Sequence, residues 1–280
     1  MLRHRSWLFL STLLLACVSC PAVEHARAKM LTDVRTVQPG KPFTVGVLLH
    51  IDPGWHVYWI NPGDSGLPTA VQFQFPAGFD VGPVRFPVPR RFDLPGNVIN
   101  YGYENQVLLT ARVTPPKDLS VGSSIPATAS VKWLCCEKVC IPGKAKLQAT
   151  LPVDSRANPA NTKLFEEWEQ RLPVPPQRDS GVASATARLD PSGQATVTVV
   201  WKSAPARVEL FPFPNDALSV KEVSIRHDGN TSALILRIDV LEGQKVKSDA
   251  LPLLVAYDRD ARRRGIEIDV PLEALKQQTR

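Results

Sequence analysis

Two cysteines four positions apart are the residues with the most evident chemistry in this sequence. Cys136 and Cys140 enclose the three residues 137–139, and stretches rich in β-forming residues lie on both sides. A three-residue connection is a common hairpin loop, and cysteines facing each other across its base have Cα atoms within disulfide range. The spacing therefore predicts a Cys136–Cys140 disulfide at the tip of a hairpin, with Cys135–Cys140 as the alternative pairing.

The short loop that such a disulfide closes favours a redox role. Cross-linking about five residues stabilises a fold by roughly 2 kcal/mol in the chain-entropy model, against about 4.7 kcal/mol for a loop of 100 residues. A bond that stabilises weakly and lies at an accessible tip suits repeated opening and closing. A third thiol, Cys135, points to the opposite face of the strand if the strand continues. The alternatives are a structural staple and a metal site; we assign no metal ligand and expect no cofactor.

The N-terminus has the features of an export signal. Two arginines, Arg3 and Arg5, precede the apolar stretch 7–18, which is shorter than the roughly 20 residues needed to span a bilayer. An A-x-A cleavage motif follows at residues 26–28, so we expect residues 1–28 to be a signal peptide. Cys17, preceded by Leu-Leu-Ala, makes a lipid anchor the alternative. No later segment is apolar enough to cross a membrane, so the mature chain is expected to be exported without a transmembrane segment.

Most of the chain has the pattern of short antiparallel strands. The 280 residues include 26 prolines, which disfavour helices and central strands and favour many turns. Within residues 30–153, β-rich runs such as 43–51 and 125–134 alternate with turn signals, which predicts an antiparallel sandwich. The turn signals are Asp52-Pro53-Gly54, Asn61-Pro62-Gly63, Pro76-Ala77-Gly78 and Pro95-Gly96-Asn97.

The second half repeats this architecture after a break. Residues 154–180 contain one short amphipathic helical stripe, ending at Pro173, and a proline-rich extended linker at residues 172–176. Residues 181–280 contain six further candidate strands. We therefore expect an all-β protein with two immunoglobulin-like antiparallel β-sandwich domains, joined by a short helix and a Pro-rich linker.

The charge of the chain does not indicate nucleic-acid binding. The formal net charge is +6, but the basic residues are scattered and no run alternates them with aromatic residues. Nucleic-acid binding proteins usually have their basic residues clustered on one face or along one element. A mildly basic, solvated surface is the simpler interpretation.

Three motifs resemble a known family. They are Gly54–Pro68 (GWHVYWINPGDSGLP), Tyr101-Gly102-Tyr103 and the segment Trp133–Pro142 around the cysteines. Together they resemble the N-terminal periplasmic region of the DsbD/ScsB family of transmembrane thiol:disulfide reductases, in particular its ScsB-like branch. The resemblance covers residues 30–153 with specific motifs and the remainder more loosely.

The resemblance implies an immunoglobulin-like domain in the periplasm whose two cysteines relay electrons from a thioredoxin-like domain to periplasmic thiol proteins. By this resemblance, Cys140 is the exposed cysteine that attacks and Cys136 the one that resolves the mixed disulfide. Thiol–disulfide exchange requires that order of events. The family also has a cap loop that shields the pair. The residues that align with it are Asn100, Tyr101, Gly102 and Tyr103.

The sequence also departs from that family. It has neither the transmembrane domain nor the thioredoxin-like domain with its C-x-x-C motif, and it has the additional Cys135. Our hypothesis is a periplasmic thiol–disulfide exchange protein, reduced by a separate membrane thiol reductase or a thioredoxin-like partner. The alternatives are a non-catalytic β-sandwich adaptor with a structural disulfide, and a copper-tolerance protein that binds Cu(I), which thiolates suit.

Overall fold

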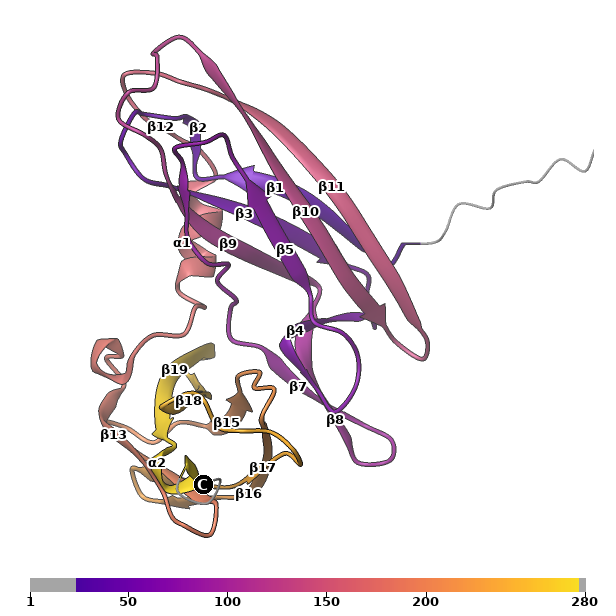
Figure 1. Ribbon diagram of the computed structural model, residues 1–280, viewed down its shortest axis with the longest axis vertical. Helices are drawn as coiled ribbons and strands as arrows, with labels where there is room; N and C mark the ends of the chain where they lie inside the picture. The colour runs from indigo at the N-terminus through magenta and orange to yellow at the C-terminus, as the bar shows by residue number, and fades with distance from the viewer. Residues whose placement is uncertain (1–23, 277–280) are drawn as a thin grey trace, which may run out of the picture.

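The protein consists of two β-sandwiches, one elongated and one compact (Figure 1). The structure is a computed structural model that describes residues 24–276. Cys17 and most of the predicted signal peptide lie outside the described residues. The predicted all-β class with two immunoglobulin-like sandwiches is confirmed, because strands dominate both halves.

The first sandwich packs two antiparallel sheets face to face. One sheet has the strand order β1-β3-β9-β6, and the other has the order β11-β10-β4-β8-β7 with β5 paired to β10. Apolar residues alternate inward along these strands and form one core. A small β2–β12 pair lies beside them. The strands are β1 Ala26–Thr32, β2 Val34–Thr36, β3 Phe43–Ile51, β4 His56–Gly63, β5 Ala70–Gln74, β6 Asp80–Val81, β7 Arg90–Leu94, β8 Val98–Glu104, β9 Gln106–Thr114, β10 Ser124–Cys136, β11 Cys140–Pro152 and β12 Asn158–Pro159.

The second sandwich has its own core between a sheet of order β13-β14-β17-β16 and a sheet of order β15-β18-β19. Strand β14 illustrates how this core forms: every second side chain is apolar and buried, and those between are half-buried on the other face of the sheet. The elements are β13 Val182–Leu189, β14 Gln194–Trp201, β15 Arg207–Pro212, β16 Leu218–Asp228, β17 Thr231–Val240, β18 Ala250–Arg259, β19 Arg262–Pro271 and the terminal helix α2 Glu273–Lys276.

The connection between the sandwiches begins with helix α1, Thr162–Glu169. Its buried side chains, Phe165 and Trp168, pack into the core of the first sandwich. The predicted proline-rich linker follows, and the short 3-10 helix η1, Pro176–Arg178, leads into β13. No helix within residues 24–276 is long and apolar enough to cross a membrane.

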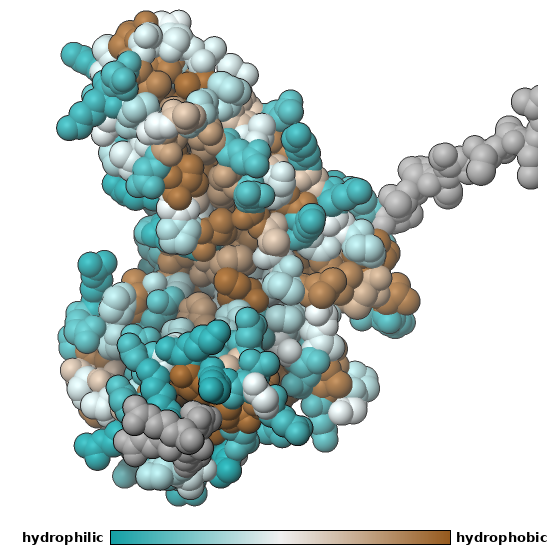
Figure 2. Space-filling view, in the orientation of Figure 1, coloured by the Kyte–Doolittle hydropathy of each residue, from teal (hydrophilic) through white to brown (hydrophobic). Residues whose placement is uncertain are grey.

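Aromatic residues from both sandwiches meet where the two bodies join. Phe211 of β15 is fully buried and lies edge-on to Tyr101, with ring centroids 4.9 Å apart. Trp59 of β4 lies 6.1 Å from Phe211 and 5.0 Å from Phe213. The Asn61 side-chain amide donates a 2.8 Å hydrogen bond to the carbonyl of Pro212. The surface shows hydrophobic residues gathered at the same waist (Figure 2).

The folded part of the chain starts inside the segment predicted as the signal peptide. Strand β1 begins at Ala26, which is fully buried and pairs with Ile51. His25 stacks on Trp55 with ring centroids 3.7 Å apart, and Arg27 forms a 2.9 Å ion pair with Asp52. Cleavage at the predicted motif, after residue 28, would remove three of the seven residues of β1. The structure therefore disfavours that cleavage position.

One predicted turn was wrong. The Asn61–Gly63 segment continues strand β4, because it pairs again with β8 after a register shift between Tyr58 and Gly63. The Asn61 side chain accepts a 3.0 Å hydrogen bond from the backbone N–H of Gly63 and also contacts the second sandwich. These tertiary contacts override the local turn signal, which describes the chain as if it were isolated.

Candidate functional site

The hairpin of β10 and β11 positions the two cysteines. Its thirteen paired positions run in continuous register from Ser124 opposite Pro152 to Cys136 opposite Cys140. The loop is residues 137–139, and a disulfide joins Cys136 to Cys140 with Cα atoms 4.2 Å apart. Cys140 is exposed, whereas Cys136 is only 2% exposed. One sulfur is thus open to another protein while the other is shielded.

The disulfide lies at the end of a row of directly paired residues. Cys140, Cys136, His56 and Glu104 oppose one another in turn across β11, β10, β4 and β8. Directly opposed residues of antiparallel strands have side chains on the same face of the sheet. The row therefore links the disulfide to the strand pair β4–β8, which also contacts the second sandwich.

Tyr58 provides a hydrogen-bond donor to the shielded sulfur. Its hydroxyl donates to Cys136 Sγ at 3.2 Å and lies 4.0 Å from Cys140 Sγ. Burial, with a smaller effect from Cys135, raises the pKa of the Tyr58 hydroxyl, which keeps its proton available for donation. A thiolate formed at Cys136 would be stabilised by this proton, because hydrogen bonds to charged acceptors are the stronger ones.

Further groups hold the Tyr58 ring in place. The buried Asn100 side chain donates to the Tyr58 hydroxyl at 3.4 Å and accepts from the Ser65 hydroxyl at 3.0 Å. Gly66 lies against the ring with a φ of 93°, and a Cβ atom there would approach Tyr58 Cζ to 2.3 Å. Only glycine fits this left-handed position so close to the ring.

His56 packs beneath the same face. It is 6% exposed, stacks on Phe92 at 4.7 Å and contacts Tyr58 edge-on at 5.2 Å. Burial lowers the pKa of His56, and the charge of Glu104 opposes this shift in part. Its Nε2 atom has no hydrogen-bond partner among the described residues. A neutral imidazole therefore lies one strand away from Cys136.

Cys135 lies apart from this site. It is 1% exposed, is not disulfide-bonded, and packs in the core of the first sandwich on the face opposite Cys136. Burial raises the pKa of the Cys135 thiol to about 12, with a smaller effect from Asp52. The nucleophile in thiol chemistry is the thiolate, so this residue is unreactive at neutral pH.

We therefore expect Cys135 to resist alkylation in the native protein. At pH 8 a thiol with a pKa of about 12 is ionised to about one part in 10,000, whereas an ordinary cysteine has a pKa of about 8.5. Iodoacetamide treatment followed by peptide mass mapping should leave Cys135 unmodified in the native protein and modify it after unfolding in guanidinium. Equal labelling rates in the two states would contradict this assignment.

The segment predicted as a cap loop is a strand, so this prediction was wrong. Its four residues lie in strand β8, which is paired on both sides in the interior of a sheet. Asn100 contacts Tyr58 from within the sheet, and the Tyr103 hydroxyl instead donates to the carbonyl of Pro87 at 2.7 Å. The turn signal at Pro95-Gly96-Asn97, which precedes this strand, correctly marked the only bend of the β7–β8 hairpin. The four residues are Asn100, Tyr101, Gly102 and Tyr103.

Sequence reasoning assigned no role to Tyr58, although it lies in a motif that was quoted, and it assigned Asn100 to the cap loop instead of to a contact with Tyr58. The available signal was the two-residue period of a strand, which places His56 and Tyr58 on one face and Trp59 on the other. The partner strand could not be inferred without the tertiary fold. No group of three His, Cys, Asp or Glu side chains suited to a metal occurs in the part of the chain that the structure describes.

Comparison with known proteins agrees with this geometry. Residues 27–152 match the family model "Thiol:disulfide interchange protein DsbD, N-terminal". The N-terminal periplasmic domain of ScsB from Proteus mirabilis is similar in fold over 91% of this chain and 96% of that one, with a TM-score of 0.65 and 15% sequence identity. The Neisseria meningitidis DsbD N-terminal domain in its reduced form aligns over 43% of this chain and 84% of that one, at 17% identity.

The Neisseria alignment has a TM-score of 0.26, which is too low for a structural comparison. A search of curated protein sequences gives no match. The family match includes both cysteines and strand β4, and the wider fold similarity extends into the second sandwich. Residues 27–152 of this chain therefore match the DsbD N-terminal family of thiol:disulfide interchange proteins, and the fold of most of the chain is similar to that of the ScsB N-terminal periplasmic domain.

Proposed function

We propose that this protein exchanges disulfides with other periplasmic thiol proteins through Cys136 and Cys140. The observation that supports this most directly is the asymmetric disulfide at the hairpin tip, with Cys140 exposed and Cys136 shielded. A separate membrane thiol reductase or a thioredoxin-like protein regenerates the dithiol. The family match of residues 27–152 supports the chemistry, and the partners are part of the proposal.

The proposed cycle balances two electrons and two protons. In the dithiol form the Cys140 thiolate attacks a disulfide of the partner, forms a mixed disulfide and displaces one partner thiolate. The Cys136 thiolate then attacks Cys140 Sγ, which forms the Cys136–Cys140 disulfide and releases the second partner thiolate. The partner gains two electrons and takes up two protons from the medium. Reversal of these steps by a reductant restores the dithiol.

Tyr58 has a defined part in this cycle. Its hydroxyl donates to Cys136 Sγ, the sulfur that leaves when a reductant opens the disulfide at Cys140. A stabilised leaving thiolate departs faster in thiol–disulfide exchange. The exposed Val139 next to Cys140 adds apolar surface at the point where a partner must approach.

The reduction potential of the Cys136–Cys140 pair tests the proposal. We expect equilibration in glutathione buffers to give a potential above about −300 mV, the region of exchangeable disulfides. The fraction reduced can be measured by alkylation and mass spectrometry. A potential below that value would identify a structural bond that resists the glutathione pool, and would favour the non-catalytic adaptor instead.

A further inference from the structure

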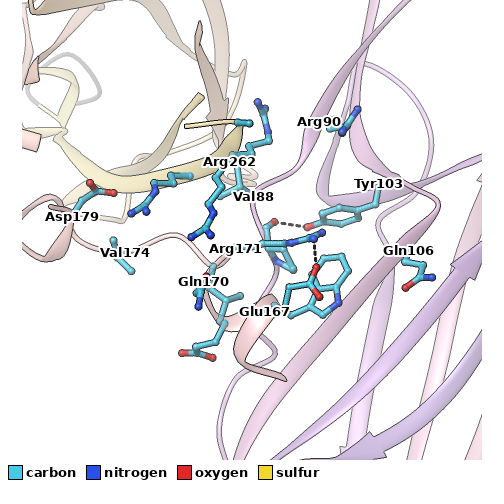
Figure 3. A pocket seen from close by; sticks show the side chains of 18 of the residues that line it. Val88, Arg90, Tyr103, Gln106, Glu167, Gln170, Arg171, Val174, Asp179 and Arg262 are labelled. Carbon is cyan, nitrogen blue, oxygen red and sulfur yellow. Dashed lines mark hydrogen bonds and ion pairs between the residues drawn. The ribbon is translucent and has the colours of Figure 1, made fainter. Parts of the chain in front are cut away.

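A large cleft lies between the two sandwiches (Figure 3). Its volume is about 1030 Å³. Three parts of the chain contribute to its lining: strands β7 and β8 of the first sandwich, the end of α1 with the segment that follows it, and the start of β19 with the turn before it. The size exceeds what a single small anion fills and suits several residues of an extended peptide.

The carboxylates at this cleft already have partners. Glu167 pairs with Arg171 one helical turn away, and Glu169 pairs with Arg85. Glu104 lies 3.5 Å from Arg90. The buried Asp179 carboxylate accepts hydrogen bonds from the Tyr257 hydroxyl and from the backbone N–H of Gly181. Glu104, Glu167 and Glu169 are therefore paired with arginines, whereas Asp179 is held by neutral donors only.

Three arginines at the cleft have no carboxylate partner within residues 24–276. They are Arg178 of η1 and Arg262 and Arg264 of β19. Arg263, between the last two, points to the opposite face of the strand, where it forms a 2.7 Å ion pair with Glu209 and donates to the carbonyl of Pro89. Because side chains alternate between the two faces of β19, Arg263 forms ion pairs on one face, and the two arginines without a carboxylate partner lie on the other.

The hairpin that presents these arginines is unfavourable by itself. Arg262 directly opposes Arg259 across the β18–β19 pair, and like charges in that arrangement are destabilising. The two turn residues, Asp260 and Ala261, have φ angles of 50° and 56°. Alanine is strained in this left-handed region, which glycine or asparagine usually occupies. Such local conflicts concentrate where binding requires them.

The cleft includes residues of β8, one of the strands that hold the redox site. Glu104 lines the cleft and belongs to the same cross-strand row as His56 and Cys136. Two strand spacings of about 4.8 Å separate the Glu104 and Cys136 backbones, roughly 10 Å in all. A partner that contacts Glu104 from the cleft would therefore have to extend roughly 10 Å along this row to reach Cys136, a short distance for a protein.

We propose that this cleft binds an acidic segment of the protein that exchanges disulfides with Cys140. The proposal rests on the proposed function and specifies the partner by its charge. Arginine guanidinium groups bind carboxylates through paired hydrogen bonds, which favours Asp- and Glu-rich sequence over a neutral peptide. Opposite charge also speeds the encounter of two proteins.

A labelled acidic peptide tests the cleft directly. Fluorescein-labelled hexaglutamate, titrated with the oxidised full chain, should bind with an anisotropy change that weakens as salt rises, because salt screens exposed charges. The double variant R262E/R264E should weaken binding at least tenfold. The matched control K221E/R226E reverses two exposed charges on β16, away from the cleft, and should change the affinity less than twofold.

Three outcomes would overturn the cleft proposal: no binding by the unmodified protein, equal loss in both double variants, or displacement of the peptide by inorganic phosphate at equal concentration. The last would indicate a site for small anions. Far-ultraviolet circular dichroism checks that each variant is folded, and R178E provides an independent substitution with the same expected direction. The rate at which uncharged dithiothreitol reduces the Cys136–Cys140 disulfide should be the same in R262E/R264E and in the unmodified protein. This measurement tests the disulfide chemistry without the cleft, so failure of the redox proposal can be distinguished from failure of the cleft proposal.

Discussion

Replacing Cys136 by serine is expected to leave the protein covalently joined to its partner through Cys140. The exposed Cys140 can still attack a disulfide or be attacked by a thiol, but the shielded residue that resolves the mixed disulfide is gone. The rate of the complete exchange cycle should fall at least about a hundredfold. Since about 1.4 kcal/mol in the activation barrier corresponds to a tenfold change in rate, this is a barrier increase of about 2.8 kcal/mol or more. Non-reducing electrophoresis and mass spectrometry after incubation with a periplasmic extract would detect the trapped species.

Two matched variants make this trap specific. Cys140→Ser should trap no partner, because the buried Cys136 cannot be reached. Cys135→Ser should retain the complete cycle, since Cys135 lies in the core with a pKa of about 12. The absence of a trapped species with Cys136→Ser, or equal trapping by Cys140→Ser, would exclude the proposed order of attack and resolution.

Strand patterns predicted most of the fold because local period-two alternation reports burial directly. The run 43–51 coincides with β3, and the run 125–134 lies within β10. Strands β7 and β8 were not predicted, because their polar and half-buried residues give no clear alternation. Strand β1 does alternate, but its first residues were assigned to the signal peptide, and strand β4 was not predicted either. Their pairing is long-range, so it depends on neighbours that the local sequence does not specify.

In the candidate site, too, the local features were predictable and the long-range ones were not. The hairpin and its disulfide depend on residues within one short stretch, 133–142, and were predicted from it. The donor to Cys136 comes from Tyr58, 78 positions away, and its own support comes from Asn100. The unneutralised arginines of the cleft come from η1 and β19, two elements that meet only when the second sandwich folds. Local chemistry was thus predictable, and its surroundings were not.

Strand β4 connects the redox site to the second sandwich through adjacent residues. Tyr58 faces the disulfide, and Trp59 faces Phe211 and Phe213. Strand β8 repeats this arrangement, with Asn100 toward Tyr58 and Tyr101 toward Phe211. The second sandwich, for which the sequence indicated no chemistry, therefore supports the strand pair that holds the site.

Truncating Phe211 to alanine should weaken the contact between the two sandwiches. The side chain is fully buried and contacts Trp59, Tyr101 and the guanidinium of Arg263, 5.6 Å from its ring. Removing a buried phenylalanine costs about 3–5 kcal/mol. We expect urea denaturation to show a loss of this size, and limited proteolysis to become faster at the linker 172–176, because the joint between the sandwiches opens.

A variant elsewhere in the first sandwich distinguishes this effect from general destabilisation. Phe75 is a half-buried aromatic residue that contacts Phe43 and Phe79, away from the joint. Phe75→Ala should lower the free energy of unfolding without faster cleavage of the linker. If Phe211→Ala and Phe75→Ala gave the same cleavage rate, the aromatic contact would not hold the two sandwiches together. The strand pair β4–β8 would then position Tyr58 and Asn100 without the second sandwich, because the hydrogen bonds of Asn100 to Tyr58 and of Tyr58 to Cys136 lie entirely within the first.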